Sequence, residues 1–95
     1  MHKSLTLYRV RHILLEDIED AEYVLEELAK GVKFEELAKE LSECESAAKG
    51  GNLGQISSGQ MAPEFERGLY KLEIDEISGP VKTEFGYHII HRLPL

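Results

Sequence analysis

The 95-residue chain is 42% hydrophobic and 31% charged, which is typical of a globular protein and not of a disordered one. Its net charge of −7 excludes the generally basic surface that DNA, RNA or anionic lipid would need, so no nucleic-acid or membrane partner is expected. This length suits one domain, and we expect residues 1–95 to form it, with a core over residues 7–93.

The first half of the chain predicts a strand followed by two helices. Residues Leu7 to Leu15 alternate and are rich in β-forming types, so they are expected to form a strand. Residues 16–31 and 33–42 carry apolar side chains at helical spacing, which predicts two amphipathic helices, the first ending at Gly31. The strand would divide its side chains between two faces, with Val10, His12 and Leu14 on one and Arg11, Ile13 and Leu15 on the other.

A glycine-rich segment opens the second half. Its glycines, at positions 50, 51, 54 and 59, indicate tight turns or a close approach of two backbones. A short strand is predicted over residues 52–56, and a helix over residues 62–72 with Pro63 in its first turn.

The C-terminal part predicts two more strands. A brief strand is expected before Gly79-Pro80, followed by a turn around residues 84–86 and a last strand over Tyr87–Leu93. This order of elements favours an α+β domain with a small, largely antiparallel sheet.

Two histidines interrupt otherwise apolar strands. His12 lies in the first strand and His88 in the last, so they would face each other if these strands pair. A purely structural role for a histidine in a strand stays open. Large apolar residues also fall where turns or a helix start are predicted, and they would suit either a pocket or plain core packing: Leu53, Met61, Phe65 and Phe85.

Three kinds of site compete for these residues. A Cys/His hydrolase would use Cys44, but no informative spacing and no oxyanion-hole motif accompany it. A metal site built from the histidines at positions 2, 12, 88 and 91 lacks ligand-type spacing, and His88 and His91 would point to opposite faces of one strand. An apolar pocket with a few polar groups at its floor suits the recognition of a small apolar unit.

The ordered motifs of the chain resemble those of the parvulin-type peptidyl-prolyl cis/trans isomerases. The segments that carry the resemblance are VRHILL (10–15), GGNLGQISSGQMAPEF (50–65) and SGPVKTEFGYHII (78–90). The similarity extends from Arg9 to Arg92, and the ordered set is far more specific than any one segment. The resemblance implies a four-stranded antiparallel sheet flanked by four helices, of the FKBP-like superfold. It also implies a monomer that needs no cofactor or metal.

The resemblance further implies a role for each matching residue. The implied roles are catalytic for His12, Cys44, Thr83 and His88, and substrate-binding for Leu53, Met61, Phe65 and Phe85. The two histidines would be paired on adjacent strands, and Thr83 would join their hydrogen-bond network. The proline ring would be held in a pocket with Phe85 at its rim. Cys44 stands where family members carry Cys or Asp.

The implied function is rotation about X–Pro peptide bonds in peptides and in unfolded or partly folded proteins, without a covalent intermediate. The alternative is a peptide-binding chaperone domain of a larger foldase with little isomerase activity. In either case the partners would be proline-containing segments of client proteins.

The loop after the first strand departs from the phosphate-specific members of the family. Those members carry a basic cluster there, which clamps a phosphate before proline. Here the loop carries acids that would repel a phosphate dianion, namely Glu16, Asp17, Glu19 and Asp20. We therefore expect no preference for phosphoserine before proline.

The cytoplasm is the expected compartment. The first 15 residues lack a separate apolar segment and a small-residue cleavage site, so no signal peptide is predicted. Cys44 is the only cysteine, which excludes an internal disulfide and agrees with a reducing environment. Export is expected instead if the chain is a domain excised from a larger foldase.

Overall fold

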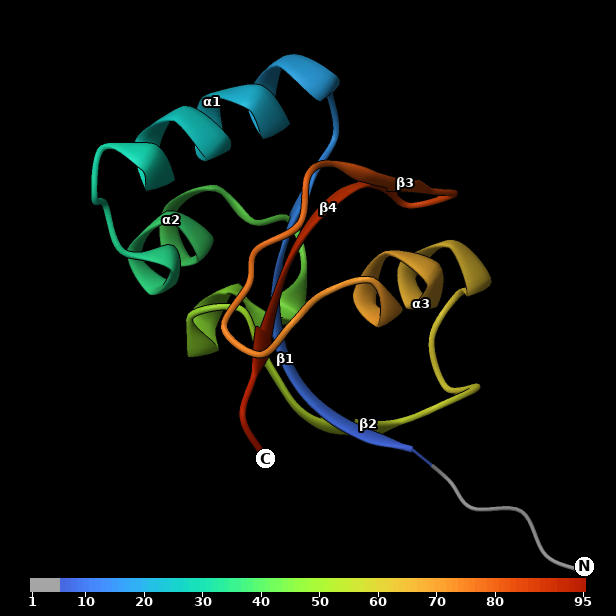
Figure 1. Ribbon diagram of the computed structural model, residues 1–95. Helices are drawn as coiled ribbons and strands as arrows, with labels where there is room; N and C mark the ends of the chain where they lie inside the picture. Colours follow the sequence, from blue (N-terminus) through green and yellow to red (C-terminus); the bar gives the residue numbers. More distant parts are fainter. Residues whose placement is uncertain (1–5) are drawn as a thin grey trace, which may run out of the picture.

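The computed structural model describes residues 6–95, which form a four-stranded sheet with helices on both of its faces (Figure 1). The strands are β1 (Leu7–Leu15), β2 (Asn52–Ser57), β3 (Val81–Thr83) and β4 (Gly86–Leu93). The helices are α1 (Ile18–Ala29), α2 (Phe34–Leu41), α3 (Pro63–Tyr70) and the short 3-10 helix η1 (Glu45–Lys49). None of the helices within residues 6–95 combines the length and the apolar content that crossing a bilayer requires.

The first and last strands of the chain lie side by side at the centre of the sheet. The order is β2-β1-β4-β3, and every neighbouring pair is antiparallel. The predicted α+β class and antiparallel sheet are therefore confirmed. Where the resemblance implied four helices, the described residues form three α-helices and one 3-10 helix of five residues. Membership of the FKBP-like superfold stays a prediction.

Side-chain alternation along the central strands builds two hydrophobic cores, one on each face of the sheet. In Figure 1, α1 and α2 cover one face and α3 covers the other. Under α1 and α2 the buried residues are Ile13, Leu15, Ala21, Val24, Phe34, Leu37, Ala38 and Ile89. Under α3 they are Val10, Ile56, Phe65, Leu69, Leu72 and Ile90. The period of two in a strand thus sends neighbouring residues of β1 to different cores, as the sequence predicted.

One predicted strand is wrong. β3 begins after Gly79-Pro80, at Val81, and not before it. Proline has no N–H to offer a ladder. The segment before it makes an isolated bridge at Ile77 and three backbone hydrogen bonds to Ile90 and Arg92 of β4, without forming a strand. The Ser78 hydroxyl accepts the Ile90 N–H at 2.9 Å, so a side chain replaces the backbone partner that a strand would supply.

Gly51 brings the glycine-rich segment against β1 directly beside His12. The His12 N–H donates to the Gly51 carbonyl at 2.9 Å, and the register of β1 with β2 shifts between Val10 and Arg11. A Cβ on Gly51 would lie 2.4 Å from the His12 carbonyl oxygen. The φ of Gly51, +85°, also disfavours any residue type other than glycine at this position. The predicted close approach of two backbones is therefore confirmed, and it fixes the main chain of His12.

Candidate active site

His12 and His88 meet on the face of the sheet that α3 covers. His12 is opposite Ile90 and His88 is opposite Leu14 in the β1–β4 ladder, so the two histidines are diagonal neighbours. Their Nδ1 atoms are 3.0 Å apart, and their rings stack with centroids 5.2 Å apart. Only 3% of His12 and 5% of His88 is exposed. The structure therefore brings the two histidines together in a buried contact.

Thr83 extends this contact into a network. Its Oγ1 lies 2.7 Å from His88 Nε2 and also accepts the Phe85 N–H at 3.2 Å. Thr83 belongs to β3, whose only partner within the described sheet is β4. The network thus joins side chains from three adjacent strands, β1, β4 and β3, which fixes the orientation of both rings.

The contact between two Nδ1 atoms requires that one of them carries a proton and the other does not. Among residues 6–95, His12 Nε2 is buried without a hydrogen-bond partner. Since a buried N–H rarely lacks an acceptor, we assign the proton of His12 to Nδ1 and leave its Nε2 bare. His88 then accepts at Nδ1 and donates from Nε2 to Thr83, so one chain of donors runs from His12 to Thr83.

Burial keeps both imidazoles neutral. Burial first, and then the charge that His88 would carry, lower the pKa of His12 from 6.5 to about 4. Burial also lowers the pKa of His88. Because desolvation disfavours the charged form of each ring, the pair is uncharged at neutral pH. It forms a polar but uncharged contact in apolar surroundings.

A cavity of about 250 Å³ adjoins the two histidines. Its lining consists of His12, Leu14, Cys44, Leu53, Met61, Phe85 and His88. This volume lies below the roughly 300–1,000 Å³ of sites for drug-sized ligands, so it suits a single small ring. Phe85 is 68% exposed and stands at the rim of the cavity.

Phe65 supports the histidines from α3. It is 1% exposed and does not line the cavity. Its ring meets His12 at 74° and His88 at 89°, with centroids 5.8 and 5.3 Å apart. Edge-to-face contacts of this kind contribute roughly 0.5–1.5 kcal/mol beyond area burial. These contacts fix the orientation of both imidazole rings.

Six of the eight predicted site residues line the cavity, and Phe65 and Thr83 lie behind it. The short strand predicted over residues 52–56 is confirmed as β2, so Leu53 belongs to a strand and not to a turn. Leu14 was missed as a lining residue. It lies two positions after His12 on the same strand face, so the alternation of β1 was the signal that could have identified it.

Hydrogen bonds hold the segment before Cys44 against the end of β1. The Glu43 N–H donates to the Leu14 carbonyl at 2.8 Å, and the Leu14 N–H donates to the Ser42 hydroxyl at 3.0 Å. These contacts place Cys44 at the cavity. Within the described residues its thiol makes no hydrogen bond to either histidine. The contact between nucleophile and base that a Cys/His hydrolase needs is therefore not formed there.

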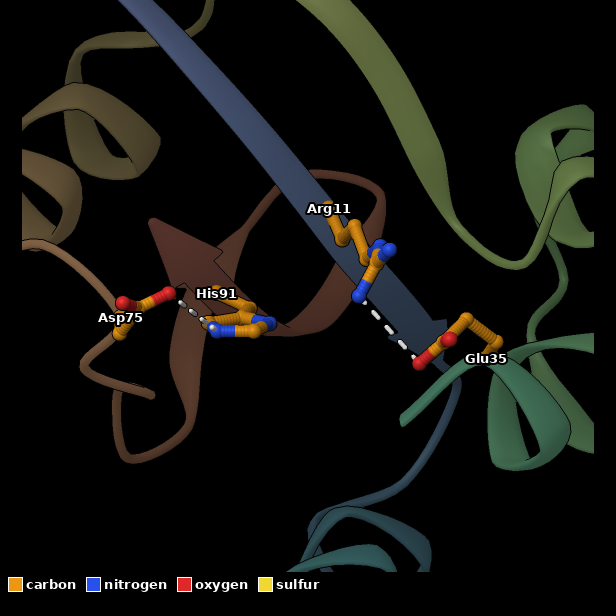
Figure 2. Close-up of polar contacts among 4 residues, drawn as sticks. All are labelled: Arg11, Glu35, Asp75 and His91. Atoms are coloured by element: carbon orange, nitrogen blue, oxygen red, sulfur yellow. Dashed lines mark hydrogen bonds and ion pairs between the residues drawn. The ribbon is translucent and has the colours of Figure 1, made fainter. Parts of the chain in front are cut away.

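His91 lies on the opposite face of the sheet from His88, as predicted. Figure 2 shows its ring next to Asp75, with His91 Nε2 3.9 Å from Asp75 Oδ1, while Arg11 pairs with Glu35 of α2 at 3.2 Å. No group of three or more side chains within residues 6–95 could hold a metal ion. The remaining histidine, His2, lies outside the described residues.

Comparison with known proteins assigns the chain to a family. The Rotamase model, described as the PPIC-type PPIASE domain, matches residues 15–93, so the chain belongs to this family of peptidyl-prolyl isomerase domains. The chain is 53% identical over 83 residues to "Foldase protein PrsA 1" of Bacillus cereus and 51% identical over 85 residues to "Foldase protein PrsA" of Bacillus subtilis. These matches cover 86% and 88% of this chain but 29% of each relative, so the chain spans under a third of their length.

Solved structures show the same fold. PrsA from Bacillus subtilis matches with a TM-score of 0.90 and 48% identity, over 94% of this chain and 35% of that one. NmPin, the parvuline of Nitrosopumilus maritimus, matches with a TM-score of 0.84 and 44% identity, over 98% of this chain and 100% of that one. The parvulin resemblance inferred from the sequence motifs is therefore confirmed.

The depressed pKa of His12 should make folding depend on pH. In the unfolded chain His12 titrates near 6.5, and in the folded chain near 4. The unfolded state therefore takes up the proton first. The contribution of His12 to the free energy of unfolding is complete above pH about 6.5 and is lost as the pH falls toward 4, by an amount on the order of 3 kcal/mol.

Denaturant unfolding of the wild type and of His12→Gln between pH 7 and pH 4 measures this contribution. The free energy of unfolding should fall less steeply with decreasing pH in the variant. The titration of acidic side chains is common to both proteins. It therefore cancels when the pH dependence of the free energy of unfolding is compared between them. Equal slopes would contradict the assignment of a neutral, buried His12.

Proposed function

We propose that this domain rotates X–Pro peptide bonds in peptides and in unfolded or partly folded proteins by a non-covalent mechanism. The observation that carries the proposal is the small apolar cavity next to two neutral, hydrogen-bonded histidines. Membership of the PPIC-type family supports the same reaction. The chain spans 29% of the length of the PrsA relative from Bacillus cereus. The isomerase activity of the whole protein is therefore proposed as well.

Rotation about a prolyl peptide bond breaks no covalent bond. The barrier of about 18–20 kcal/mol comes from amide resonance, which is lost in the twisted state. An enzyme accelerates the rotation by binding the twisted amide more tightly than either planar form. Lowering the barrier by about 4 kcal/mol already gives roughly a thousandfold acceleration. An apolar grip on the proline ring and a few fixed polar groups are enough for a change of this size.

The proposed roles follow from where the side chains lie around the cavity. Leu53 and Met61 would hold the proline ring, with Phe65 behind them keeping the histidine rings in place. An apolar surround disfavours the planar amide, whose resonance form separates charge. The histidine pair, oriented by Thr83, would present fixed dipoles that need no reorganisation during the rotation. Phe85 at the exposed rim would contact the residues that flank the proline.

Cys44 is proposed to act without covalent chemistry. Attack of its sulfur on the carbonyl would add a step that rotation does not need. Its side chain lines the cavity, so it contributes through shape and polarity. The tolerance of Asp at the matching position, implied by the family resemblance, fits such a role.

The remaining features of the proposal concern the setting of the domain. One domain over residues 1–95 with its core in 7–93 is supported by the sheet, which pairs the first strand with the last. Proline-containing segments of client proteins are the proposed partners. The proposed state is a monomer, in the cytoplasm for the chain as given and exported if the chain is a domain of a larger foldase. The alternative is a chaperone domain that binds peptides without turning them over. The intact set of cavity-lining residues favours the enzyme.

Truncating the proposed proline pocket should impair catalysis. Met61→Ala removes ring contacts in an apolar cavity, so kcat/KM for Ala-X-Pro-Phe peptides should fall by about 5- to 150-fold, or ~1–3 kcal/mol of transition-state binding. Ile74→Ala is the matched control, because Ile74 is 54% exposed and does not line the cavity.

A cis/trans isomerisation assay on these peptides provides the measurement, with circular dichroism to show that each variant is folded. Near-wild-type kcat/KM in folded Met61→Ala would contradict the pocket. A wild-type domain that binds the peptides and accelerates none of them would establish the chaperone alternative instead.

The acidic loop after β1 should disfavour phosphorylated substrates. Its four acids, Glu16, Asp17, Glu19 and Asp20, are all exposed between β1 and the first turn of α1. A phosphoserine carries about −1.5 to −2 charges at neutral pH and would find like charges there. We expect kcat/KM to be highest for peptides with an apolar or basic residue before proline, lower for Ser-Pro and lowest for phosphoserine-Pro. High salt should reduce the difference between Ser-Pro and phosphoserine-Pro.

Matched peptides assayed at two ionic strengths test this order. A clear preference for phosphoserine-Pro would overturn it. That result would point to Lys49, which lines a second hollow of about 410 Å³ that shares Cys44 and Leu53 with the first.

A further inference from the structure

Met61 reaches the cavity from a segment that belongs to no helix or strand. Residues 58–62 connect β2 to α3 and are here called the Met61 loop. The loop turns at Gly59, which has a φ of +87°. α3 begins after Ala62, which provides no side-chain cap, so the loop needs another anchor if Met61 is to stay in one position.

Glu66 of α3 supplies that anchor. Its Oε2 accepts the Gly59 N–H at 2.6 Å and the Met61 N–H at 3.3 Å. Its Oε1 accepts the Tyr70 O–H at 3.0 Å. Tyr70 in turn stacks on Tyr8 of β1, with ring centroids 5.5 Å apart. One carboxylate thus connects the backbone of the Met61 loop to α3 and, through Tyr70, to the sheet.

The carboxylate of Glu66 is charged when it makes these contacts. Burial alone would raise the pKa of Glu66, but the hydrogen bonds from Tyr70, Met61 and Gly59 outweigh it and lower the pKa. Glu66 also lies in the first turn of α3, where the helix dipole favours a negative charge. Hydrogen bonds to an ionised acceptor are stronger than those between neutral groups. The anchor is therefore strongest at neutral pH.

We infer that Glu66 is a positioning residue for the proline pocket, because it fixes the backbone of the Met61 loop and so the Met61 wall. The inference rests on the proposed role of Met61. Glu66 does not line the cavity, so it acts on substrate through Met61 and not by contact. Its carboxylate accepts from main-chain N–H groups, so Glu66 positions the loop by hydrogen bonds to the backbone.

Three variants of α3 separate this role from a general effect of charge. Glu66→Ala removes all three hydrogen bonds and should lower kcat/KM for an X–Pro peptide by about tenfold, mainly through a higher KM. Glu66→Gln keeps an acceptor for the loop and should stay within about threefold of the wild type. Glu64→Gln makes the same charge change at an exposed acid of the same turn, and it should leave kcat/KM unchanged.

A double-mutant cycle shows whether Glu66 acts through Met61. In a Met61→Ala background, Glu66→Ala should lower kcat/KM by less than about twofold, because the wall that it positions is already gone. Loss of the full tenfold in both backgrounds would overturn the inference. If Met61→Ala has no effect in the wild type, the proposed pocket fails and the inference with it. If Met61→Ala impairs catalysis and Glu66→Ala does not, only the inference fails.

Nuclear magnetic resonance gives a readout that does not use activity. The chain has two methionines, so the ε-methyl signal of Met61 is identified by its absence in Met61→Ala. In Glu66→Ala this signal should move toward the position of a mobile methionine, while in Glu64→Gln it should not move. An unmoved signal in Glu66→Ala would overturn the inference. If Glu66→Ala does not fold, the Gly59 and Met61 amide proton shifts in Glu66→Gln decide, because losing the charged acceptor should move both upfield.

Discussion

The 3.0 Å contact between His12 Nδ1 and His88 Nδ1 is the interaction on which the site depends. It forms only if exactly one of the two nitrogens carries a proton. Burial lowers the pKa of both rings, so the pair that makes this contact is neutral at neutral pH. The contact joins the two central strands on one face of the sheet, and Thr83 and Phe65 then fix the rings from β3 and from α3. The result is a rigid, uncharged polar surface beside an apolar cavity, which suits a reaction that only twists an amide.

The sheet keeps this surface separate from the charged residues around it. Successive residues of β1 and β4 point to opposite faces, so Arg11 and His91 form their polar contacts on the α1–α2 side (Figure 2). His12 and His88 remain on the α3 side, where both contact Phe65. A slip of β1 by one residue against β4 would turn His12 away from His88 and bring Arg11 to the α3 side. The close approach of Gly51 to the backbone of His12 and the register shift of β1 against β2 are features that fix this arrangement.

Much of the fold could be predicted from the sequence because its signals were local, whereas the roles of the site residues came from the family resemblance. Alternation in β1 gave its two faces, and the glycines at 50 and 51 indicated the close approach that the structure contains. The strand predicted before Gly79-Pro80 was wrong because the Ser78 hydroxyl, and not a backbone carbonyl, accepts the Ile90 N–H. No pattern of hydrophobic residues reveals such a hydrogen bond. The anchoring of the Met61 loop by Glu66 was equally invisible, because it joins a carboxylate to N–H groups up to seven positions earlier in the chain. Contacts between specific polar atoms require the assembled structure.

The measurement that tests the central claim most directly is the ¹⁵N spectrum of the histidine side chains at neutral pH. Two neutral rings joined by one shared proton should give one protonated and one bare nitrogen on each ring, with the proton of His12 on Nδ1 and that of His88 on Nε2. Both rings should titrate below 6.5, the ordinary pKa of histidine, and His12 should stay neutral down to a pH of about 4. An imidazolium signal from either ring at pH 7, or two protonated Nδ1 atoms, would contradict the paired, neutral histidines from which the function is argued.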